Sequence, residues 1–350
     1  MVSIGIIECV PNFSEGRNQI IIDKIVKSAK DIPGCKVIGA EPDSDYNRTV
    51  LTLAGSAAGV SEAAFRVIST AAELIDMRVH EGEHPRMGAV DVCPFVALDE
   101  KDSELCADLA KQLSLRVEEE LELPVFLYGD AARTQFRYEL SAVRKGQYEG
   151  LKDRLLGKSM IHSDSTAMPD NGVREWTEKV EKFGAVSIGA RPVLVAYNVN
   201  LDEKDARVAK ICGSIIRSSG RLLKNQKGKK IRTGGMLEKV QGMGVKLESH
   251  GISQVSMNLQ DVSITDLHLA FECIKSIAAD HGVNVIGSEL VGLAPLSSFL
   301  AAGDWFTESE EESDDLKLVA AAVEGLGLSQ LSPFEANKRV IEWAATGGPE

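Results

Sequence analysis

One order of secondary-structure segments occurs twice along this chain, and this repetition limits the folds that the chain can adopt. In the first hundred residues, short apolar or β-branched runs, typical of strands, alternate with two stretches of helical periodicity. Proline, glycine and aspartate separate several of these segments, as expected for turns. The predicted order is β-α-β-β-α-β, with segments at residues 3–9, 18–31, 36–40, 49–54, 61–77 and 90–98.

The same order returns in the second half of the sequence. Within residues 252–259, Val255, Met257 and Leu259 alternate with polar residues, which is typical of a half-buried strand. Two copies of this order predict an α+β fold of two ferredoxin-like (βαββαβ) subdomains with a ligand cleft between them. The segments of the second copy lie at residues 192–199, 203–218, 239–247, 252–259, 266–279 and 283–291.

We expect each copy to form one sheet with its helices packed on one face, and we place the boundary near Phe183. Before it lie an additional helix at residues 103–119 and a polar, irregular stretch at residues 146–183. The acidic run at residues 308–315 indicates a solvated connection to closing helices. The predicted division is an N-terminal subdomain at residues 1–182, a C-terminal subdomain at residues 183–303, and the acidic connection with C-terminal helices at residues 304–350.

The charge and the cysteines of the chain exclude several classes of protein. Its 350 residues include 39 Lys and Arg against 52 Asp and Glu, a formal net charge of −13, which argues against coating nucleic acid or an anionic membrane. No run reaches the ~18 apolar residues of a membrane-spanning helix. The six scattered cysteines include no C-x-x-C pair and predict free thiols rather than a zinc ribbon or disulfides. Since no basic leader is visible, we expect a cytoplasmic protein.

The densest polar motif lies at residues 79–88, between a predicted helix and a predicted strand. His80 and His84 are four residues apart and match the letters of the H-E-x-x-H zinc-protease motif. That motif requires a helix, which Gly82 and Pro85 disfavour, so we expect no metal here. Two alternatives remain, a structural turn whose histidines bind nearby carbonyls and an acid–base histidine. We favour the second, because histidine titrates near neutral pH.

Two further polar segments follow predicted strands. Asn12, Ser14 and Glu15 lie where the first strand ends, and they could either face a cleft or cap the next helix. Residues 43–49 place Arg48 and two aspartates at the join of two strands, as a polar turn also would. Each segment alone is therefore compatible with a structural role.

A run of positive charge interrupts the second copy. Residues 221–239 contain seven Lys and Arg but one acid, Glu238, and the run overlaps the glycine-rich residues 234–244. Sites for single-stranded nucleic acid interleave aromatic residues with basic ones, and none occurs in this run. The run is either a flexible, solvated loop or an electrostatic landing site for a polyanionic small molecule.

Motifs along nearly the whole chain resemble the formiminotransferase domain family. The most specific is Gly82-Glu-His-Pro-Arg-Met-Gly88, and Lys239-Val-Gln-Gly-Met-Gly244 is a second close match. The resemblance implies two ferredoxin-like subdomains, in agreement with the repeated order of segments. The other matching stretches lie at residues 8–16, 47–50, 74–77, 91–95, 127–129 and 287–293.

The resemblance also implies an activity. Members of the family transfer the formimino group from N-formimino-L-glutamate to tetrahydrofolate, giving 5-formiminotetrahydrofolate and L-glutamate in histidine degradation. The family's acid–base histidine corresponds to His84, and its active-site aspartate corresponds to Glu41, which is one methylene longer. We therefore expect small-molecule substrates, tetrahydrofolate as co-substrate, no metal, and a cytoplasmic homodimer without nucleic-acid or membrane partners.

Further site residues follow from the resemblance and from charge complementarity. Arg48 and Arg86 are candidates to bind the carboxylates of glutamate, and Asn12 is a further substrate-binding candidate. A formyltransferase acting on N-formylglutamate and a non-catalytic folate-binding relative remain alternatives. The family's first folate-contacting segment is longer and more charged here. The family has two folate-contacting segments, and the resemblance implies that their counterparts in this chain bind folate. The residues predicted to do so are Gly172, Trp176, Phe183, Gly184, Gly235, Met236, Leu237, Glu238, Lys239, Val240, Gln241, Gly242, Met243 and Gly244.

Overall fold

The computed structural model describes residues 5–82, 84–161, 167–307 and 314–349. The chain forms two compact units, Met1–Pro192 and Val193–Glu350, and both mix helices with sheets. Within the described ranges, no helix is both long enough and apolar enough to span a membrane. The α+β class is confirmed.

The first unit is built on a seven-stranded sheet in the order β1-β4-β2-β5-β7-β6, with β3 paired to the outer side of β4. The pairs β5–β7 and β6–β7 are parallel, and all other pairs in this sheet are antiparallel. The strands are β1 (Ile7–Cys9), β2 (Asn12–Phe13), β3 (Cys35–Asp43), β4 (Arg48–Gly55), β5 (Val90–Ala97), β6 (Val125–Gly129) and β7 (Val186–Arg191).

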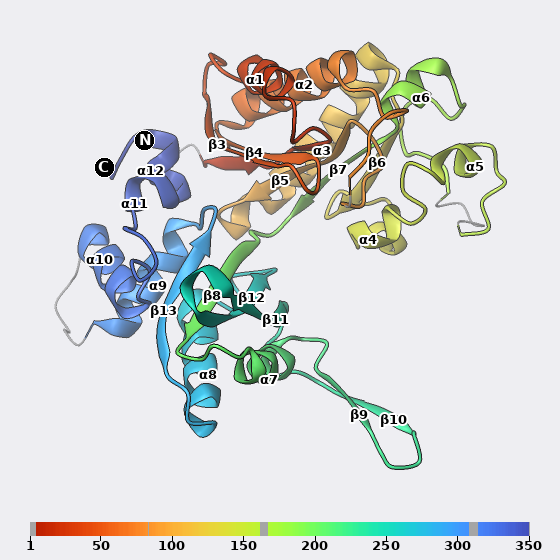
Figure 1. The fold of residues 1–350 in the computed structure, drawn as a ribbon. Coiled ribbons are helices and arrows are strands. Elements are labelled where there is room, and N and C mark those ends of the chain that lie inside the picture. Colours follow the sequence, from red (N-terminus) through yellow and green to blue (C-terminus); the bar gives the residue numbers. More distant parts are fainter. Residues whose placement is uncertain (1–4, 83, 162–166, 308–313, 350) are drawn as a thin grey trace. The chain divides into compact units, whose positions relative to one another are not determined.

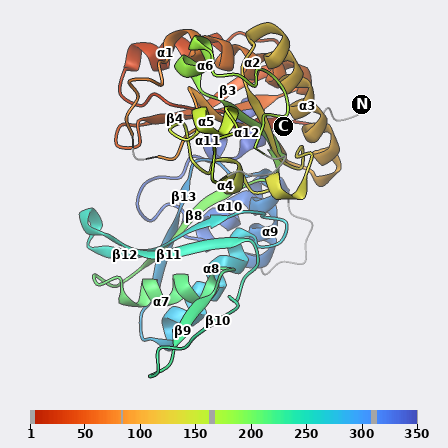
Figure 2. The same ribbon diagram turned by 90° about the vertical axis from the view of Figure 1, so that its right-hand side faces the viewer.

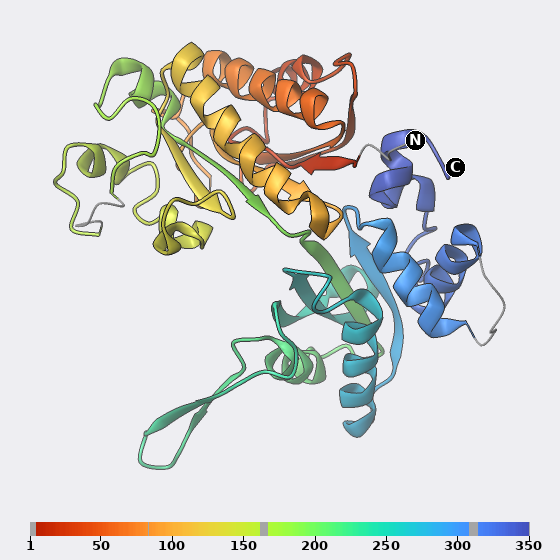
Figure 3. The same ribbon diagram turned by 180° about the vertical axis from the view of Figure 1, so that it is seen from behind.

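Three helices cover one face of this sheet (Figure 1). They are α1 (Gln19–Ser28), α2 (Ala57–Leu74) and α3 (Ser103–Arg116), and Figure 3 shows α2 and α3 side by side. Asn18 caps α1 by accepting from two backbone N–H groups, and Ser56 caps α2 in the same way from Gly59. Buried side chains such as Ile25, Ile68 and Leu113 join the helices to the sheet in one core.

The first unit departs from the predicted four-stranded sheet with one covered face. Strands β2, β6 and β7 were not predicted, because runs of two to six residues are too short to show a periodicity that separates a buried strand from a loop. A second apolar cluster, including Phe126, Tyr128, Val143 and Leu151, covers the other face of β6. It involves α4 (Leu140–Val143), α5 (Leu151–Leu155) and α6 (Glu178–Phe183). The chain is still in this sheet at Arg191, beyond residue 182, where we expected the first subdomain to end.

The second unit contains the predicted β-α-β-β-α-β order. Its four strands form an antiparallel sheet in the order β11-β12-β8-β13. Helices α7 and α8 contact each other and the sheet, and therefore lie on the same face. The elements are β8 (Val195–Leu201), α7 (Arg207–Ile216), β11 (Val240–Leu247), β12 (Ile252–Leu259), α8 (Leu267–Asp280) and β13 (Val285–Val291).

The cationic run forms an antiparallel hairpin of β9 (Arg221–Lys224) and β10 (Lys230–Thr233). All eight strand residues are exposed, and the hairpin projects from α7 and α8 (Figures 1 and 2). Part of the cationic run is thus a pair of hydrogen-bonded strands, whereas one of our two sequence-based alternatives was a flexible loop. The unit ends with α9 (Leu296–Phe306), α10 (Asp315–Gly325), α11 (Ala336–Arg339) and α12 (Ile341–Thr346), while acidic residues 308–313 lie outside the described residues.

Strand β11 can approach α7 only because it carries glycine. A Cβ at Gly244 would lie 2.1 Å from the backbone nitrogen of Lys210 on α7. We therefore expect Gly244→Ala to lower the free energy of unfolding by about 1–3 kcal/mol, the usual cost of overpacking. Gly234→Ala is the control, because nothing lies within 4 Å of the added atom. Urea denaturation followed by circular dichroism compares them, and equal midpoints would contradict the close approach.

Candidate active site

Ten polar and aromatic residues of the first unit surround one small cavity. They come from the end of β2, the turn before β4 and β4 itself, the loop before β5, and β5. The cavity measures about 10 Å³, close to the least space that holds one water molecule. Its lining residues are Asn12, Phe13, Ser14, Tyr46, Asn47, Arg48, His80, His84, Arg86 and Asp91.

The side chain of Asn47 joins the three segments that form this cavity. Its Nδ2 donates to the carbonyl of Glu81 at 2.8 Å, and its Oδ1 accepts from the backbone N–H of Gly16 at 3.0 Å. Asn47 has φ +49°, a left-handed conformation that asparagine tolerates better than most residues. Ser14 adds a second tie, donating to the carbonyl of Gly88 at 2.8 Å. Ser14 thus holds the loop at residues 79–88, here called the histidine loop. The cap of the next helix, α1, is Asn18 and not Ser14.

His84 forms its closest polar contact with an arginine. Nη1 of Arg48 lies 2.7 Å from Nε2 of His84. Because a guanidinium only donates, Nε2 must accept, so the imidazole is neutral with its proton on Nδ1. Burial, followed by the charges of Arg48 and Arg144, lowers the pKa of His84 to about 4. The neutral form, which can act as a base, therefore dominates near pH 7.

His80 points to different partners and has a structural role. Its Nε2 donates to the carbonyl of Asn47 at 2.9 Å, and its Nδ1 accepts from Nε of Arg86 at 3.3 Å. Burial lowers its pKa. The described residues around both histidines form an irregular loop, not the helix that a zinc-protease motif requires. The described part of the chain contains no cluster of His, Cys, Asp and Glu suited to a metal.

Arg86 is already paired with an acid. Its Nη2 and Nη1 lie 2.7 Å and 3.0 Å from the two carboxylate oxygens of Glu149, a bidentate ion pair. The Arg86 side chain is 10% exposed, against 62% for Glu149. A substrate carboxylate could bind Arg86 only by displacing Glu149. Sequence reasoning missed Glu149, which lies in the stretch expected to be irregular.

A second ion pair lies beside His84. Arg144, which follows α4, pairs with Asp91 of β5, whose side chain is 4% exposed. Oδ1 of Asp91 also accepts from the backbone N–H of Met87 at 3.0 Å, which fixes the end of the histidine loop. Burial raises the pKa of the Asp91 carboxyl, and Arg144 opposes this shift. Asp91 and Arg144 are 53 residues apart in the sequence, so no local sequence pattern could predict that they pair.

Comparison with known proteins identifies the family. Residues 6–191 match the N-terminal subdomain of the formiminotransferase domain, and residues 196–346 match the formiminotransferase domain. This chain belongs to the formiminotransferase family. It is therefore an enzyme, a transferase of one-carbon groups.

Relatives in this family are similar over most of the chain. A glutamate formimidoyltransferase of Streptococcus pyogenes serotype M1 is 41% identical, covering 87% of this chain and 94% of that protein. Another, of Thermoplasma acidophilum, is 36% identical and covers 87% of this chain and 93% of that protein. The formimidoyltransferase-cyclodeaminase of Mus musculus is 40% identical to this chain. The match covers 99% of this chain and 61% of the mouse protein.

The family's carboxylate position, Glu41, lies on β3. It pairs with Val50 in the sheet, and Asn12 pairs with the same residue from the other side. Opposed residues share a face, so Glu41, Asn12 and Arg48 lie on the face away from the helices. Glu41 is exposed and is not among the residues lining the cavity, whereas Asn12 is.

The first segment that we predicted to contact folate lies in the first unit. Phe183 is 1% exposed in the core, and Gly184 (φ +84°) contacts Gly88 of the histidine loop through a β-bridge. Gly172 also has a positive φ of +82°. Trp176 is half-buried beside Tyr148, and its Nε1 is buried without a hydrogen-bond partner among the described residues. Of the four, only Trp176 thus has a buried donor left to bind a ligand.

The second segment that we predicted to contact folate, Gly235 to Gly244, lies in the second unit and ends on β11. Gly242 and Gly244 face α7, while Gln241 and Met243 alternate with them and point to the other face. Met236 and Met243 are 57% and 61% exposed. Leu237 and Val240 are buried, whereas Glu238 and Lys239 are exposed. The exposed methionines and Gln241 are the side chains of this segment best placed to touch a ligand.

The face of the second sheet away from α7 carries a polar network that sequence reasoning missed. Nε2 of Gln254 donates to Oδ1 of Asn200 at 2.8 Å and to Oε2 of Glu289 at 3.0 Å. Asn198 donates to the same Glu289 oxygen at 3.1 Å. Gln254 is only 4% exposed, although its strand alternates polar and apolar residues. The sequence did contain a signal for this network, because polar residues occur at positions of β8, β12 and β13 that pair with one another.

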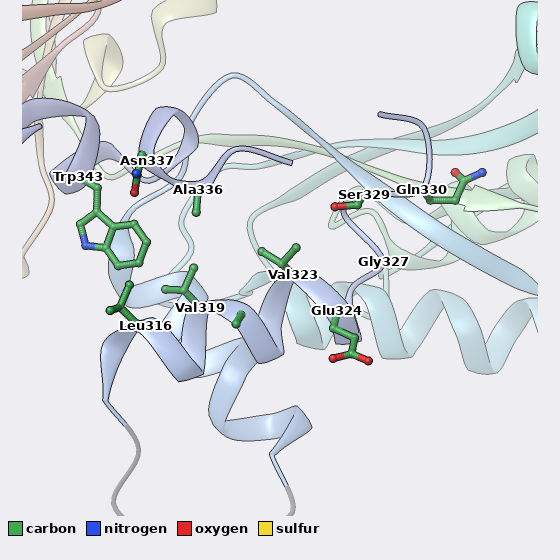
Figure 4. Close-up of a pocket in the computed structure, with 11 residues that line it drawn as sticks. Leu316, Val319, Val323, Glu324, Gly327, Ser329, Gln330, Ala336, Asn337 and Trp343 are labelled. Atoms are coloured by element: carbon green, nitrogen blue, oxygen red, sulfur yellow. The ribbon is translucent and has the colours of Figure 1, made fainter. Parts of the chain in front are cut away.

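A larger cavity, of about 550 Å³, lies in the second unit beside α10 (Figure 4). Val319, Val323 and Trp343 make much of its wall apolar, and Glu324 is the one charged residue among the described residues that line it. Its described lining residues include no histidine to move a proton and no cation to bind a carboxylate. The smaller cavity around His84 is therefore the candidate site.

Replacing Asp91 by asparagine tests the buried ion pair. The change keeps the size of the side chain but leaves Arg144 without its countercharge. We expect the free energy of unfolding to fall by about 3–5 kcal/mol. Asp108→Asn, which disrupts an exposed pair with Lys111, should cost less than about 1 kcal/mol. Urea denaturation measures both, and similar losses would contradict the role of Asp91.

Proposed function

We propose that this chain transfers the formimino group from N-formimino-L-glutamate to tetrahydrofolate, with His84 as the acid–base group. The observation that carries the proposal is the neutral imidazole of His84 within the family motif, held beside Arg48 by a 2.7 Å hydrogen bond. Membership in a family with named glutamate formimidoyltransferases supports the choice of substrates.

The reaction needs a group that both accepts and returns a proton. Attack of a folate nitrogen on the formimino carbon forms a C–N bond and gives a tetrahedral intermediate. Neutral His84 takes the proton from the attacking nitrogen, and its imidazolium then protonates the departing glutamate nitrogen as the original C–N bond breaks. Glu41 could stabilise the amidinium from its face of the sheet.

We extend the proposal to the architecture and setting of the enzyme. The sheet order β11-β12-β8-β13 supports a ferredoxin-like second subdomain. The first subdomain would be an enlarged version of the same fold, with β6 and β7 added to its sheet. The resemblance further suggests a cytoplasmic homodimer acting in histidine degradation, with tetrahydrofolate as co-substrate.

A coupled absorbance assay tests the activity. The purified protein is given tetrahydrofolate with formiminoglutamate, and formation of 5-formiminotetrahydrofolate is followed. We expect turnover with formiminoglutamate and little with formylglutamate. Faster turnover of formylglutamate would identify a formyltransferase instead. Folate binding without turnover of either donor would identify a non-catalytic relative.

His84 and His80 are expected to differ in their effect on turnover. His84→Ala removes the proton shuttle and should lower kcat by about 10²- to 10⁴-fold, with little change in folate affinity. His80→Ala, the matched control, removes contacts to Asn47 and Arg86 and should affect stability more than kcat. Turnover, folate binding and bound zinc are measured for both variants. Similar losses of kcat would contradict the assignment.

The cationic hairpin is expected to attract the anionic tail of folate. Lys224 and Lys230 are directly opposed across the hairpin, which concentrates positive charge on one face. Polyglutamylated folate should bind more tightly than the monoglutamate, and added salt should reduce the difference, because exposed charges are screened over ~10 Å at 0.1 M. Replacing Lys227, Lys229 and Lys230 together by glutamine should remove it.

Exposed lysines of α1 and the turn after it provide the control for this experiment. Replacing Lys24, Lys27 and Lys30 by glutamine removes the same charge from a different unit and should leave the preference intact. Isothermal titration calorimetry at two salt concentrations gives the affinities. Equal affinity of the unmodified protein for both folates at low salt would assign the hairpin another role.

A further inference from the structure

Arg48 differs from the other two arginines around His84 in its partners. Arg86 is paired with Glu149 and Arg144 with Asp91, whereas Arg48 makes no ion pair with any described residue. Its Nε is buried and has no hydrogen-bond acceptor among those residues. A half-buried guanidinium with an unsatisfied donor is suited to bind a carboxylate.

The one strong hydrogen bond of Arg48 occupies the atom that the reaction needs. Nη1 donates to Nε2 of His84 at 2.7 Å and uses the lone pair with which that nitrogen would accept a proton. Tyr46 closes the same corner, with its ring 5.9 Å from that of His84 and 5.7 Å from the Arg48 guanidinium carbon. The remaining space of about 10 Å³ has room for about one water molecule and is too small for the substrate. Arg48 must move before His84 can act as a base.

We propose that Arg48 is a gate on His84, which it blocks as seen here and releases when its guanidinium binds a carboxylate of the glutamate-bearing substrate. The proposal rests on the proposed function, because that function supplies the carboxylate. A bidentate guanidinium–carboxylate pair is stronger than one hydrogen bond to a neutral ring, so the exchange is favourable. Arg48 is thus a positioning residue that exposes the base only when the donor is present.

The charges around His84 determine how the gate would be detected. Arg48, Arg144 and Arg86 all disfavour the imidazolium, and burial disfavours it most. A hydrogen bond to the backbone of Pro85 favours it, and must involve the carbonyl because proline has no N–H. Asp91 lies nearby but is neutralised by Arg144. When a carboxylate neutralises Arg48 and withdraws it from Nε2, the pKa of His84 must therefore rise.

Nuclear magnetic resonance of ¹⁵N-histidine-labelled protein tests the gate without relying on turnover. The His84 signal is assigned by its loss in His84→Gln, and its titration is followed with and without saturating L-glutamate. We expect the pKa of His84 to rise from about 4 by about one unit or more, a tenfold gain in proton affinity, when glutamate binds. In Arg48→Met the pKa should already be raised, and glutamate should not raise it further.

Control variants separate a local effect from a general loss of charge. Arg17→Met removes an exposed arginine that hydrogen-bonds to Ser44 instead of His84, and should titrate as the unmodified protein does. Arg48→Gln provides a second neutral variant if Arg48→Met does not fold. Arg48→Lys keeps the charge and should retain a low pKa, but it cannot form the bidentate pair, so glutamate should raise the pKa less.

The outcomes distinguish the gate from the proposed function. Glutamate that binds, as measured by calorimetry, without changing the titration of His84 would overturn the gate alone. An unchanged His84 pKa in both neutral variants would also overturn it. Absence of glutamate binding would overturn the proposed function and the carboxylate release together.

Discussion

The candidate active-site cavity depends on the amide side chain of Asn47. A histidine on a loop that contains glycine and proline has no helix or strand to hold it, so other groups must supply rigidity. Asn47 binds this loop through Glu81 and the end of the first strands through Gly16, and its own backbone begins the turn into β4. The position of His84 relative to Arg48 follows from these bonds, because Arg48 is the next residue.

The charges of the site are arranged so that one cation stays available. The chain as a whole is acidic, with a net charge of −13, yet three arginines gather around one histidine. Two of them are balanced by Glu149 and Asp91 and mainly hold the loop in place. The cluster therefore keeps His84 neutral while presenting little unpaired charge to other anions.

Features that leave a pattern in neighbouring residues could be predicted from the sequence, and features that depend on distant residues could not. The second unit was predicted well, because glycine and polar turns separate its strands and its helices show clear apolar periodicity. Strands β6 and β7 were missed, since a short parallel strand that is buried on both faces shows no alternation of apolar and polar residues. His84 was predicted as a site residue through its motif, and the structure places it in the small cavity. Its neighbours Asp91, Arg144 and Glu149 were missed, because ion pairs between residues that are tens of positions apart in the sequence leave no local pattern.

The glycines of β11 have a consequence beyond their contact with α7. This strand lies at the end of its sheet, so one side of its backbone pairs with no strand among the described residues. Such an edge can recruit a strand from another molecule and start aggregation. Gly242 and Gly244 weaken its tendency to extend the sheet, and exposed Lys239 just before the strand and Lys246 within it add charge. The residues that bring helix and strand together thus also help to keep the enzyme from polymerising.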